Sequence, residues 1–370
     1  MNIMHNHPTF RPNYILLELT TRCNLRCIMC SVNDDKRLQK GGEWYGDLDS
    51  RVLSNLESVY KNIVRIDLNG SGESLLSPLF LELLKKIKKN NAKAFVGLTT
   101  NALLLDKTIA EEMVIEKLDE VIISIHAAEP TLYAEISKHG AFNKLVDNIT
   151  TLNLYKEQYH TNLPVLKINF VAMKKNIHQL EDLLHLAKKL NVSELAVLHL
   201  AEYSCVKGES LIHYPDLIKT YFSASIECAK DLGIILHIPE LYLNILRNQD
   251  TVPSGTNKLI SIYKRLLEFF KRDSLVDPLV RNCMDPWDFL FILQSGRVRP
   301  CCVLENNMGN LSEQTFEEIW QGDKYKELRS NILSNTPPKG CVTCSSRPLT
   351  RLSCLKKRVS TKTNHTIANA

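Results

Sequence analysis

Runs of β-branched and aliphatic residues alternate with amphipathic helical stretches over the first two hundred residues of this 370-residue chain. Six strands are predicted, over residues 14–20, 63–69, 93–99, 121–126, 165–171 and 194–200. Helices are predicted between them, near residues 47–61, 78–90, 106–117, 141–158 and 177–190. Repeated strand–helix–strand units form parallel strands with right-handed crossovers. The alternation therefore predicts an α/β fold, a partial (β/α)6 barrel of the TIM type with its chemistry at the C-terminal strand ends.

The pattern changes after residue 200. We expect a helix over 215–232, a short strand over 234–237, a turn at 251–256 and a helical segment to about 272. From residue 281 the chain is rich in turns and in cysteine. Four parts are predicted: a barrel core at 1–240, a connecting helical segment at 241–280, a small metal-dependent domain at 281–350 and a basic tail at 351–370.

Two local signals predict helix starts. Ser77 followed by Pro78 offers a capping hydroxyl and a proline at the first helical position. Thr315 with Glu318 forms a capping box that opens a helix through about Leu333.

Charge excludes some classes of function. The formal net charge is +5, and the tail at 351–370 holds five basic residues and no acid, so residues 1–350 balance. The chain therefore has no basic face for nucleic acid, and the tail is expected to be disordered, with at most a weak anionic contact. No apolar run is long enough to cross a membrane, and the N-terminus lacks a signal-peptide pattern, so a cytoplasmic protein without a membrane partner is expected.

Eleven cysteines, an odd number, fit a disulfide framework poorly in such a chain. Cys23, Cys27 and Cys30 follow the first predicted strand in the pattern CxxxCxxC. Three thiolates around a 4Fe–4S cube leave one iron without a protein ligand, open to a substrate or cofactor. A structural zinc ion would need a fourth ligand from elsewhere in the chain.

With this motif inside a β/α repeat, the chain resembles the radical S-adenosylmethionine (SAM) enzymes over about residues 14–350. In that family the open iron binds the amino and carboxylate groups of SAM, and an electron from the cluster cleaves SAM to a 5′-deoxyadenosyl radical. Gly72 and Glu73 match the family's Gly-Gly-Glu-Pro loop, which contacts the SAM amino group, whereas Ser71 and Ser74 depart from it.

The resemblance extends to the later predicted strands. Thr99-Thr100-Asn101 is similar to the family's Thr-Asn-Gly segment. Ser124 lies where the family has a serine that contacts SAM, and His126 replaces an aspartate of that segment. The remaining expected contacts are Met29 and Leu198 near the adenine and Asn169 near the ribose.

A second group of cysteines begins at Cys283. Twelve residues separate Cys283 from Gly296 and four more precede Cys301, and Cys341 and Cys344 form a CxxC pair. On ligand count alone, the group suits either a second 4Fe–4S cluster or a zinc ion.

The segment around these cysteines is similar to the SPASM/twitch extension of radical SAM enzymes. Thr350 stands where the full SPASM pattern has its next cysteine, so the shorter twitch form is expected, with one auxiliary 4Fe–4S cluster on Cys283, Cys301, Cys341 and Cys344. Cys302 is an alternative to Cys301, and Cys354 falls at a later position of the pattern. Cys205 and Cys228 stand alone and are expected to be buried thiols.

The resemblance implies an oxidoreductase that abstracts hydrogen from a small polar metabolite such as a sugar or an aminocyclitol. The auxiliary cluster would accept the second electron, as in twitch-type dehydrogenases, and a flavodoxin or ferredoxin would supply reducing electrons. Such an oxidation needs a base near the C–OH group, for which His126, His199 and Glu202 are candidates.

Two alternatives remain open. The first is radical modification of a peptide or protein side chain. Only 22 residues precede Cys23, so no leader-binding domain is expected before the barrel, which disfavours a peptide substrate. The second alternative is a non-catalytic metal-binding scaffold.

Overall fold

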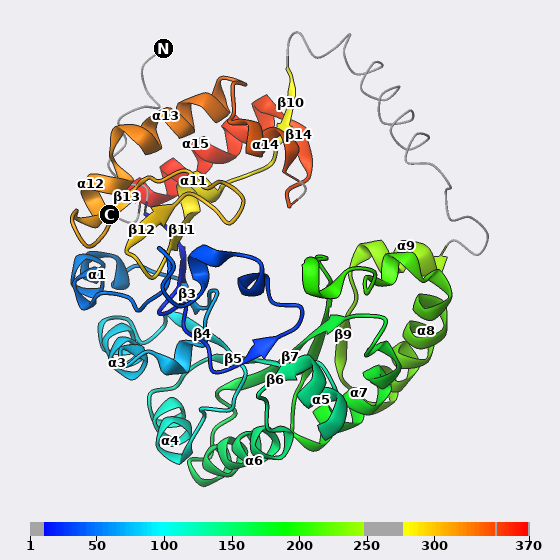
Figure 1. The fold of residues 1–370 in the computed structure, drawn as a ribbon. Coiled ribbons are helices and arrows are strands. Elements are labelled where there is room, and N and C mark those ends of the chain that lie inside the picture. The colour runs from blue at the N-terminus through cyan, green and yellow to red at the C-terminus, as the bar shows by residue number, and fades with distance from the viewer. Residues whose placement is uncertain (1–10, 248–276, 345, 369–370) are drawn as a thin grey trace. The chain divides into compact units, whose positions relative to one another are not determined.

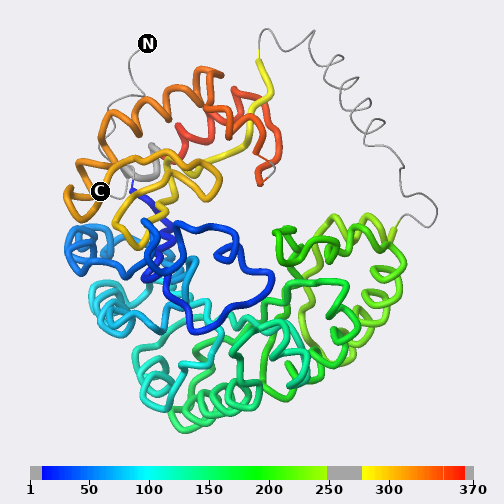
Figure 2. The backbone as a smooth tube through the Cα atoms, viewed as in Figure 1, coloured from blue at the N-terminus to red at the C-terminus, as the bar shows by residue number. Residues whose placement is uncertain are grey.

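The computed structural model describes residues 11–247, 277–344 and 346–368. The chain divides into two compact units (Figure 1, Figure 2). One, here the barrel unit, comprises Leu17–Leu48 and Ile66–Val252. The other, here the accessory unit, comprises Met1–Leu16, Asp49–Arg65 and Pro253–Ala370. The four domain boundaries expected from the sequence stay a prediction.

A mostly parallel sheet forms the centre of the barrel unit. Its strands lie in the order β3 (Arg65–Leu68), β4 (Phe95–Thr100), β5 (Glu120–Ser124), β7 (Val165–Ala172), β8 (Glu194–His199) and β9 (Ile235–His237). Pairing is parallel from β4 through β9. The predicted α/β partial barrel is confirmed, and the short strand predicted at 234–237 is β9, which adds a further parallel strand after β8.

Helices connect these strands as the alternation predicts. They are α3 (Phe80–Asn90), α4 (Lys107–Ile115), α5 (Pro130–Ile136), α6 (Phe142–Gln158), α7 (Leu180–Lys189) and α8 (Pro215–Leu232). Figure 1 shows α3, α4, α6, α7 and α8 on the outer side of the curved row of strands. In α7 the buried residues Leu180, Leu183, Leu184 and Ala187 recur at helical spacing, so one stripe packs inward and the opposite face meets solvent.

A ladder of charged groups joins four strands of the barrel unit. The Lys167 ammonium on β7 lies 2.9 Å from the Glu120 carboxylate on β5 and 3.0 Å from the Glu194 carboxylate on β8. Glu194 in turn lies 3.0 Å from His237 on β9. Glu120 is only 4% exposed, so its charge depends on Lys167 for compensation.

Several predicted helix boundaries are wrong. Helix α3 begins at Phe80, because the Ser77 hydroxyl accepts the Leu79 N–H and so caps the preceding turn. The capping box at Thr315 is confirmed, but the single predicted helix is two, α12 (Phe316–Trp320) and α13 (Asp323–Leu333), separated at Gly322. Likewise, the stretch 47–61 forms α1 (Ser50–Asn55) and α2 (Glu57–Tyr60).

The accessory unit contains two groups of hydrogen-bonded strands. Strands β13 (Gly309–Asn310), β12 (Arg297–Arg299), β11 (Phe289–Ile292) and β1 (Tyr14–Leu17) lie in that order, and β10 (Leu279–Arg281) pairs with β14 (Leu349–Arg351). Most of β1, the first predicted strand, therefore belongs to this unit. The Tyr14 and Phe289 rings pack edge to face at 4.9 Å between centroids.

The basic tail is helical, and the expectation of disorder is wrong. Residues Leu352–Ala368 form α15. Leu352, Leu355 and Val359 are buried and repeat at helical spacing, so the helix has an apolar stripe that a composition argument overlooks.

Part of the expected connecting segment is described. Helix α9 spans Glu240–Arg247. The predicted turn at 251–256 and the helical segment to 272 lie outside the described residues. Among the described helices, none has the length and apolar character needed to cross a membrane.

Candidate functional site

The first three cysteines lie together in one loop of the barrel unit. Cys23, Cys27 and Cys30 line a cavity of about 410 Å³ with Thr21 and Ser71. Strand β2 (Arg26–Cys27) pairs with β6 (Ser137–Lys138), which places Cys27 opposite Ser137. The loop is thus fastened to the end of α5 by backbone pairing, a long-range contact that the sequence does not reveal.

The environment of these thiols disfavours the bare thiolate. Burial raises the pKa of all three, and it raises the pKa of Cys27 to about 12. The Ser137 hydroxyl partly offsets this shift at Cys27, whereas the charges of Cys23 and Cys30 add to it. The three thiols line one cavity, so a cation placed there would favour their deprotonated forms.

The loop after β3 packs directly against this cysteine loop. A Cβ atom at Gly72 would lie 2.4 Å from the Thr20 carbonyl oxygen and 2.5 Å from that of Arg22. The Glu73 N–H also donates to the Arg22 carbonyl at 2.8 Å. Glycine at position 72 is therefore required by the close approach of two backbones.

Glu73 connects this loop to the end of β4. Its carboxylate is 2% exposed and accepts hydrogen bonds from the Thr100 hydroxyl (2.7 Å), the Asn101 N–H (2.7 Å) and the Leu75 N–H (3.2 Å). Burial raises the pKa of Glu73, and these donors oppose that shift. The carboxylate is thus held by the protein's own donors.

Asn101 and Asn24 were not among the predicted site residues. The Asn101 side-chain amide donates to the Asn24 side-chain oxygen at 2.8 Å, and Asn24 lies between Cys23 and Cys27. The end of β4 therefore holds the cysteine loop as well as the Gly72–Glu73 loop. The Thr-Asn segment was the available signal, but it did not identify Asn24 as its partner.

The predicted SAM contacts on β5 and β7 lie side by side. Ser124 and Asn169 are partners in the parallel register, as are Val171 and Leu198 on β7 and β8. Leu198 is 39% exposed, which is high for a leucine at a strand end, whereas Met29 is buried. No bound nucleoside tests these contacts, and they stay predictions.

His126 is a poor candidate for a base. It is 6% exposed, and burial lowers its pKa to about 4. Its Nδ1 accepts the Val171 N–H at 3.2 Å, so the neutral ring carries its proton on Nε2. Asn176 donates to the His126 carbonyl and fixes the segment further. At neutral pH the ring is therefore a hydrogen-bond donor.

The Glu202 carboxylate accepts hydrogen bonds from its own loop. Its carboxylate accepts the N–H groups of Gly208 (3.1 Å) and Ser210 (2.9 Å) and lies 3.2 Å from the His213 ring. These interactions lower its pKa. The arrangement suits a residue that orders residues 202–213.

His199 is exposed at the end of β8, and its partner was not predicted. Its Nδ1 lies 2.9 Å from the hydroxyl of Tyr242 on α9. Burial raises the pKa of Tyr242 to about 12, so the tyrosine oxygen stays a neutral hydroxyl that can accept a hydrogen bond. In the tautomer whose Nδ1–H donates to this oxygen, the accessible Nε2 of His199 is unprotonated and can accept a proton. Of the three predicted candidates, His199 has the most suitable environment for a base.

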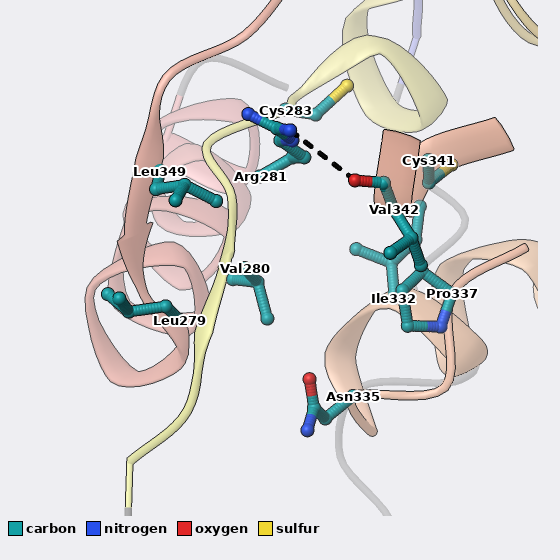
Figure 3. Close-up of a pocket in the computed structure, with 10 residues that line it drawn as sticks. All are labelled: Leu279, Val280, Arg281, Cys283, Ile332, Asn335, Pro337, Cys341, Val342 and Leu349. Atoms are coloured by element: carbon teal, nitrogen blue, oxygen red, sulfur yellow. Dashed lines mark hydrogen bonds between the residues drawn. The ribbon is translucent and has the colours of Figure 1, made fainter. Parts of the chain in front are cut away.

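The second group of cysteines gathers in the accessory unit. Cys283 and Cys341 line a cavity of about 400 Å³ whose other lining residues are mostly apolar (Figure 3). The charges of Cys283 and Cys341 each interact with that of Cys301, and Cys341 also interacts with Cys344. Burial raises the pKa of Cys283 to about 12 and of Cys341 to about 11.

The other cysteines have different environments. Cys302 and Cys354 are exposed. Cys205 is exposed too, which corrects the expectation of a buried thiol, because it lies on the surface turn Ser204–Val206. Cys228 is partly buried, with its sulfur 3.8 Å from the His185 ring.

The chemistry of both donor sets fits iron–sulfur clusters. Each set consists of part-buried thiols that repel one another. Among residues 11–247, 277–344 and 346–368, no three His, Cys, Asp or Glu side chains converge as a single metal ion requires. A 4Fe–4S cube presents separated corners, so its sulfur ligands need not meet at one point.

Comparison with protein families gives two matches. The model of the radical SAM superfamily matches residues 17–187. The model of the SPASM iron–sulfur cluster-binding domain matches residues 283–345. The matched segments contain the first and second groups of cysteines, respectively.

Individual relatives are similar along most of the chain. A tungsten-containing aldehyde ferredoxin oxidoreductase cofactor-modifying protein of Pyrococcus furiosus is 23% identical, over 90% of this chain and 87% of the relative. An AdoMet-dependent heme synthase of Methanosarcina barkeri is 24% identical, over 87% and 86%. Streptococcus suis SuiB bound to SAM has a similar fold, with a TM-score of 0.58 and 16% identity, over 91% of this chain and 71% of SuiB.

Proposed function

Because the chain carries a radical SAM domain at residues 17–187 and a SPASM iron–sulfur domain at residues 283–345, we propose that it reductively cleaves SAM and uses the radical to oxidise a small polar metabolite. SAM and 4Fe–4S clusters are the cofactors that domains of these two kinds bind. When bound, the cluster and SAM supply a 5′-deoxyadenosyl radical that abstracts hydrogen.

One observation carries this proposal: the cysteine loop is seated on the Gly72–Glu73 loop. The contacts of Gly72 with Thr20 and Arg22 leave no space for a side chain between the two loops. Three clustered thiols thus lie next to a loop of the type that contacts the SAM amino group. A scaffold that only bound metal would not need this second loop at such close range.

Each residue then has a distinct task. Cys23, Cys27 and Cys30 hold the first cluster. Glu73 positions the loop that contacts SAM, and its carboxylate binds Thr100 and Asn101 instead of SAM. The side chains expected to orient the nucleoside are those of Met29, Ser124, Asn169 and Leu198. Cys283, Cys301, Cys341 and Cys344 hold one auxiliary cluster.

We assign the proton-accepting role to His199. Its Nε2 is accessible, and Tyr242 fixes the orientation of the ring through Nδ1. Oxidation of a C–OH group requires removal of the hydroxyl proton, for which a histidine is suited near neutral pH. The buried His126 then acts as a neutral donor, and Glu202 orders its loop.

A peptide is the second candidate substrate. Two proteins of similar fold were crystallised with peptides, SuiB with its precursor peptide SuiA and anSMEcpe with a Cp18Cys peptide. The anSMEcpe structure has a TM-score of 0.58 and 18% identity, over 90% of this chain and 87% of that protein. These likenesses show a shared fold, so the choice of substrate class rests on experiment. The cytoplasmic location also stays a prediction.

Anaerobic reconstitution tests the proposal. Two clusters predict about eight iron atoms per chain, and dithionite with SAM should yield 5′-deoxyadenosine. Cys27→Ala should abolish this cleavage, whereas Cys344→Ala should retain it while losing auxiliary iron. Stoichiometric zinc without cleavage of SAM would favour the scaffold and reject the proposal. Transfer of deuterium into 5′-deoxyadenosine from a carbon-deuterated metabolite pool or from a carbon-deuterated peptide pool then separates the two substrate classes.

A further inference from the structure

The accessory unit has an unusual distribution of charge. Glu327 is the last acidic residue of the chain, and eight Lys and Arg residues follow it. This acid-free stretch contains Cys341 and Cys344 and ends in helix α15. Positive charge is therefore concentrated in the segment that supplies half of the auxiliary cysteines.

Nearby acids offset only part of this charge, because Asp285 and Asp288 pair with just two of these eight basic residues. The Asp285 carboxylate lies 2.6 Å from Arg347, and Asp288 pairs with Lys362. Asp277 accepts the N–H and the hydroxyl of Ser353. The exposed residues Lys339, Lys356 and Lys357 thus add to a net positive surface.

The basic helix reaches the auxiliary site directly. The Arg358 guanidinium on α15 donates to the Asn282 side-chain oxygen at 3.0 Å, and Asn282 is next to Cys283 in the chain. On the other side, Arg281 donates to the carbonyl oxygens of Arg347 (3.1 Å) and Val342 (3.4 Å). Basic groups therefore flank Cys283 on both sides.

An apolar hollow lies beside these basic groups, and Arg281 is among its lining residues. The cavity of about 400 Å³ is lined by Val280, Ile332, Pro337, Val342 and Leu349, among others. Val342 is 61% exposed and Leu349 40% exposed, which is high for side chains of this size. In Figure 3 the two cysteines lie at one end of the hollow and Asn335 lies at the other.

We propose that this hollow and the exposed residues Lys339, Lys356 and Lys357 form the docking surface for an acidic electron-carrier protein. The carrier would exchange electrons with the auxiliary cluster. This inference rests on the proposed function. An apolar centre inside a charged rim is the usual anatomy of a protein interface, and complementary charge speeds encounter. In each exchange the reduced cluster loses one electron and the oxidised carrier gains one.

A bacterial flavodoxin, which is acidic, serves as the probe with the full-length reconstituted enzyme. Binding is measured anaerobically by titration calorimetry at low and moderate salt. The variant Lys339→Glu/Lys356→Glu/Lys357→Glu should weaken binding about tenfold and reduce its dependence on salt, and Val342→Ser should weaken it at both salt concentrations. The matched control, Lys188→Glu/Lys189→Glu/Lys230→Glu on α7 and α8, makes the same change of charge on the barrel unit and should bind like the wild type.

Electron transfer gives a second measurement. Dithionite-reduced Cys27→Ala enzyme, freed of excess reductant, retains only the auxiliary cluster and should reduce oxidised flavodoxin by one electron. Charge reversal of the three lysines should slow this step about tenfold in the same background.

Some results would overturn the docking surface. These are equal flavodoxin binding by the two charge variants, or displacement of flavodoxin from this face by an oligonucleotide that binds more tightly. Failure of the proposed function is distinguishable, because it appears as absent SAM cleavage with dithionite, which needs no carrier. All three lysines lie outside the residues assigned to SAM and the clusters, so cleavage with dithionite should be unchanged in both variants.

Discussion

The carboxylate of Glu73 accepts a hydrogen bond of 2.7 Å from the hydroxyl of Thr100. This bond joins the loop after β3 to the end of β4 in the buried interior. An unpaired polar group there would lower the free energy of unfolding. The same carboxylate also accepts the Asn101 N–H. The loop that meets the cysteines is therefore positioned by β4, and its shape depends on one buried acid.

Replacement of Glu73 tests this connection. Glu73→Ala leaves the Asn101 N–H without its partner and should reduce the free energy of unfolding by about 2–4 kcal/mol, with weaker SAM binding. Glu73→Gln retains one acceptor oxygen and should fall between the wild type and Glu73→Ala. Urea unfolding and equilibrium dialysis with SAM measure the two effects. Identical SAM affinity in all three proteins would show that the loop does not depend on Glu73.

Gly72→Ala should disturb the cysteine loop. The added methyl group would lie 2.4 Å from the Thr20 carbonyl oxygen, and a backbone group cannot rotate away as a side chain can. We expect loss of about four iron atoms per chain, those of the first cluster, measured after reconstitution. Ser71→Ala, in the same loop, is the control and should retain full iron content. A Gly72→Ala protein with full iron and normal SAM cleavage would disprove the packing argument.

His126 should make stability depend on pH. Its pKa is about 4 in the folded protein and about 6.5 when unfolded, so the unfolded chain binds more protons between these values. Stability from the neutral ring is complete above pH 6.5 and is lost as the pH falls toward 4. Between pH 7 and pH 5 the wild type should lose about 2 kcal/mol more than His126→Asn, which keeps an acceptor for Val171 but does not titrate. Parallel pH dependence of the two unfolding curves would contradict this.

The charged ladder should contribute to the stability of the barrel unit. Lys167→Met removes the counter-ion that lies 2.9 Å from the buried Glu120 carboxylate, at a cost of about 3 kcal/mol in the free energy of unfolding. Adding Glu120→Gln removes the uncompensated charge and should restore part of that loss. Chemical denaturation of the single and double variants measures the coupling. No recovery in the double variant would mean that Lys167 acts by packing alone.

Replacing either of the adjacent residues Cys301 and Cys302 tests which of them binds the auxiliary cluster. Cys301 is part-buried and its sulfur accepts the Leu304 N–H at 3.3 Å, whereas Cys302 is exposed. Cys301→Ala should lose about four iron atoms per chain, and Cys302→Ala should lose none. The reverse result would exchange the two assignments.

The strands of the barrel were predictable because β-branched runs and helical periodicity are local signals. The start of α3 was misplaced because Ser77 caps a turn instead of the helix. Helix α15 was missed because its buried Leu355 and Val359 are hidden among basic residues when composition alone is considered.

Contacts within the site were less accessible to sequence reasoning. The cysteine motif identified Cys27, but its pairing with Ser137 joins segments far apart in the chain. Tyr242 was missed for the same reason, since only folding brings α9 to His199. Residue type and spacing thus revealed which side chains carry chemistry, whereas their partners required the three-dimensional arrangement.

The Mössbauer spectrum of the ⁵⁷Fe-reconstituted protein, recorded before and after addition of SAM, tests the central claim most directly. If Cys23, Cys27 and Cys30 leave one iron open, a single iron site of about eight should change its isomer shift when SAM binds. An unchanged spectrum at saturating SAM would contradict the account.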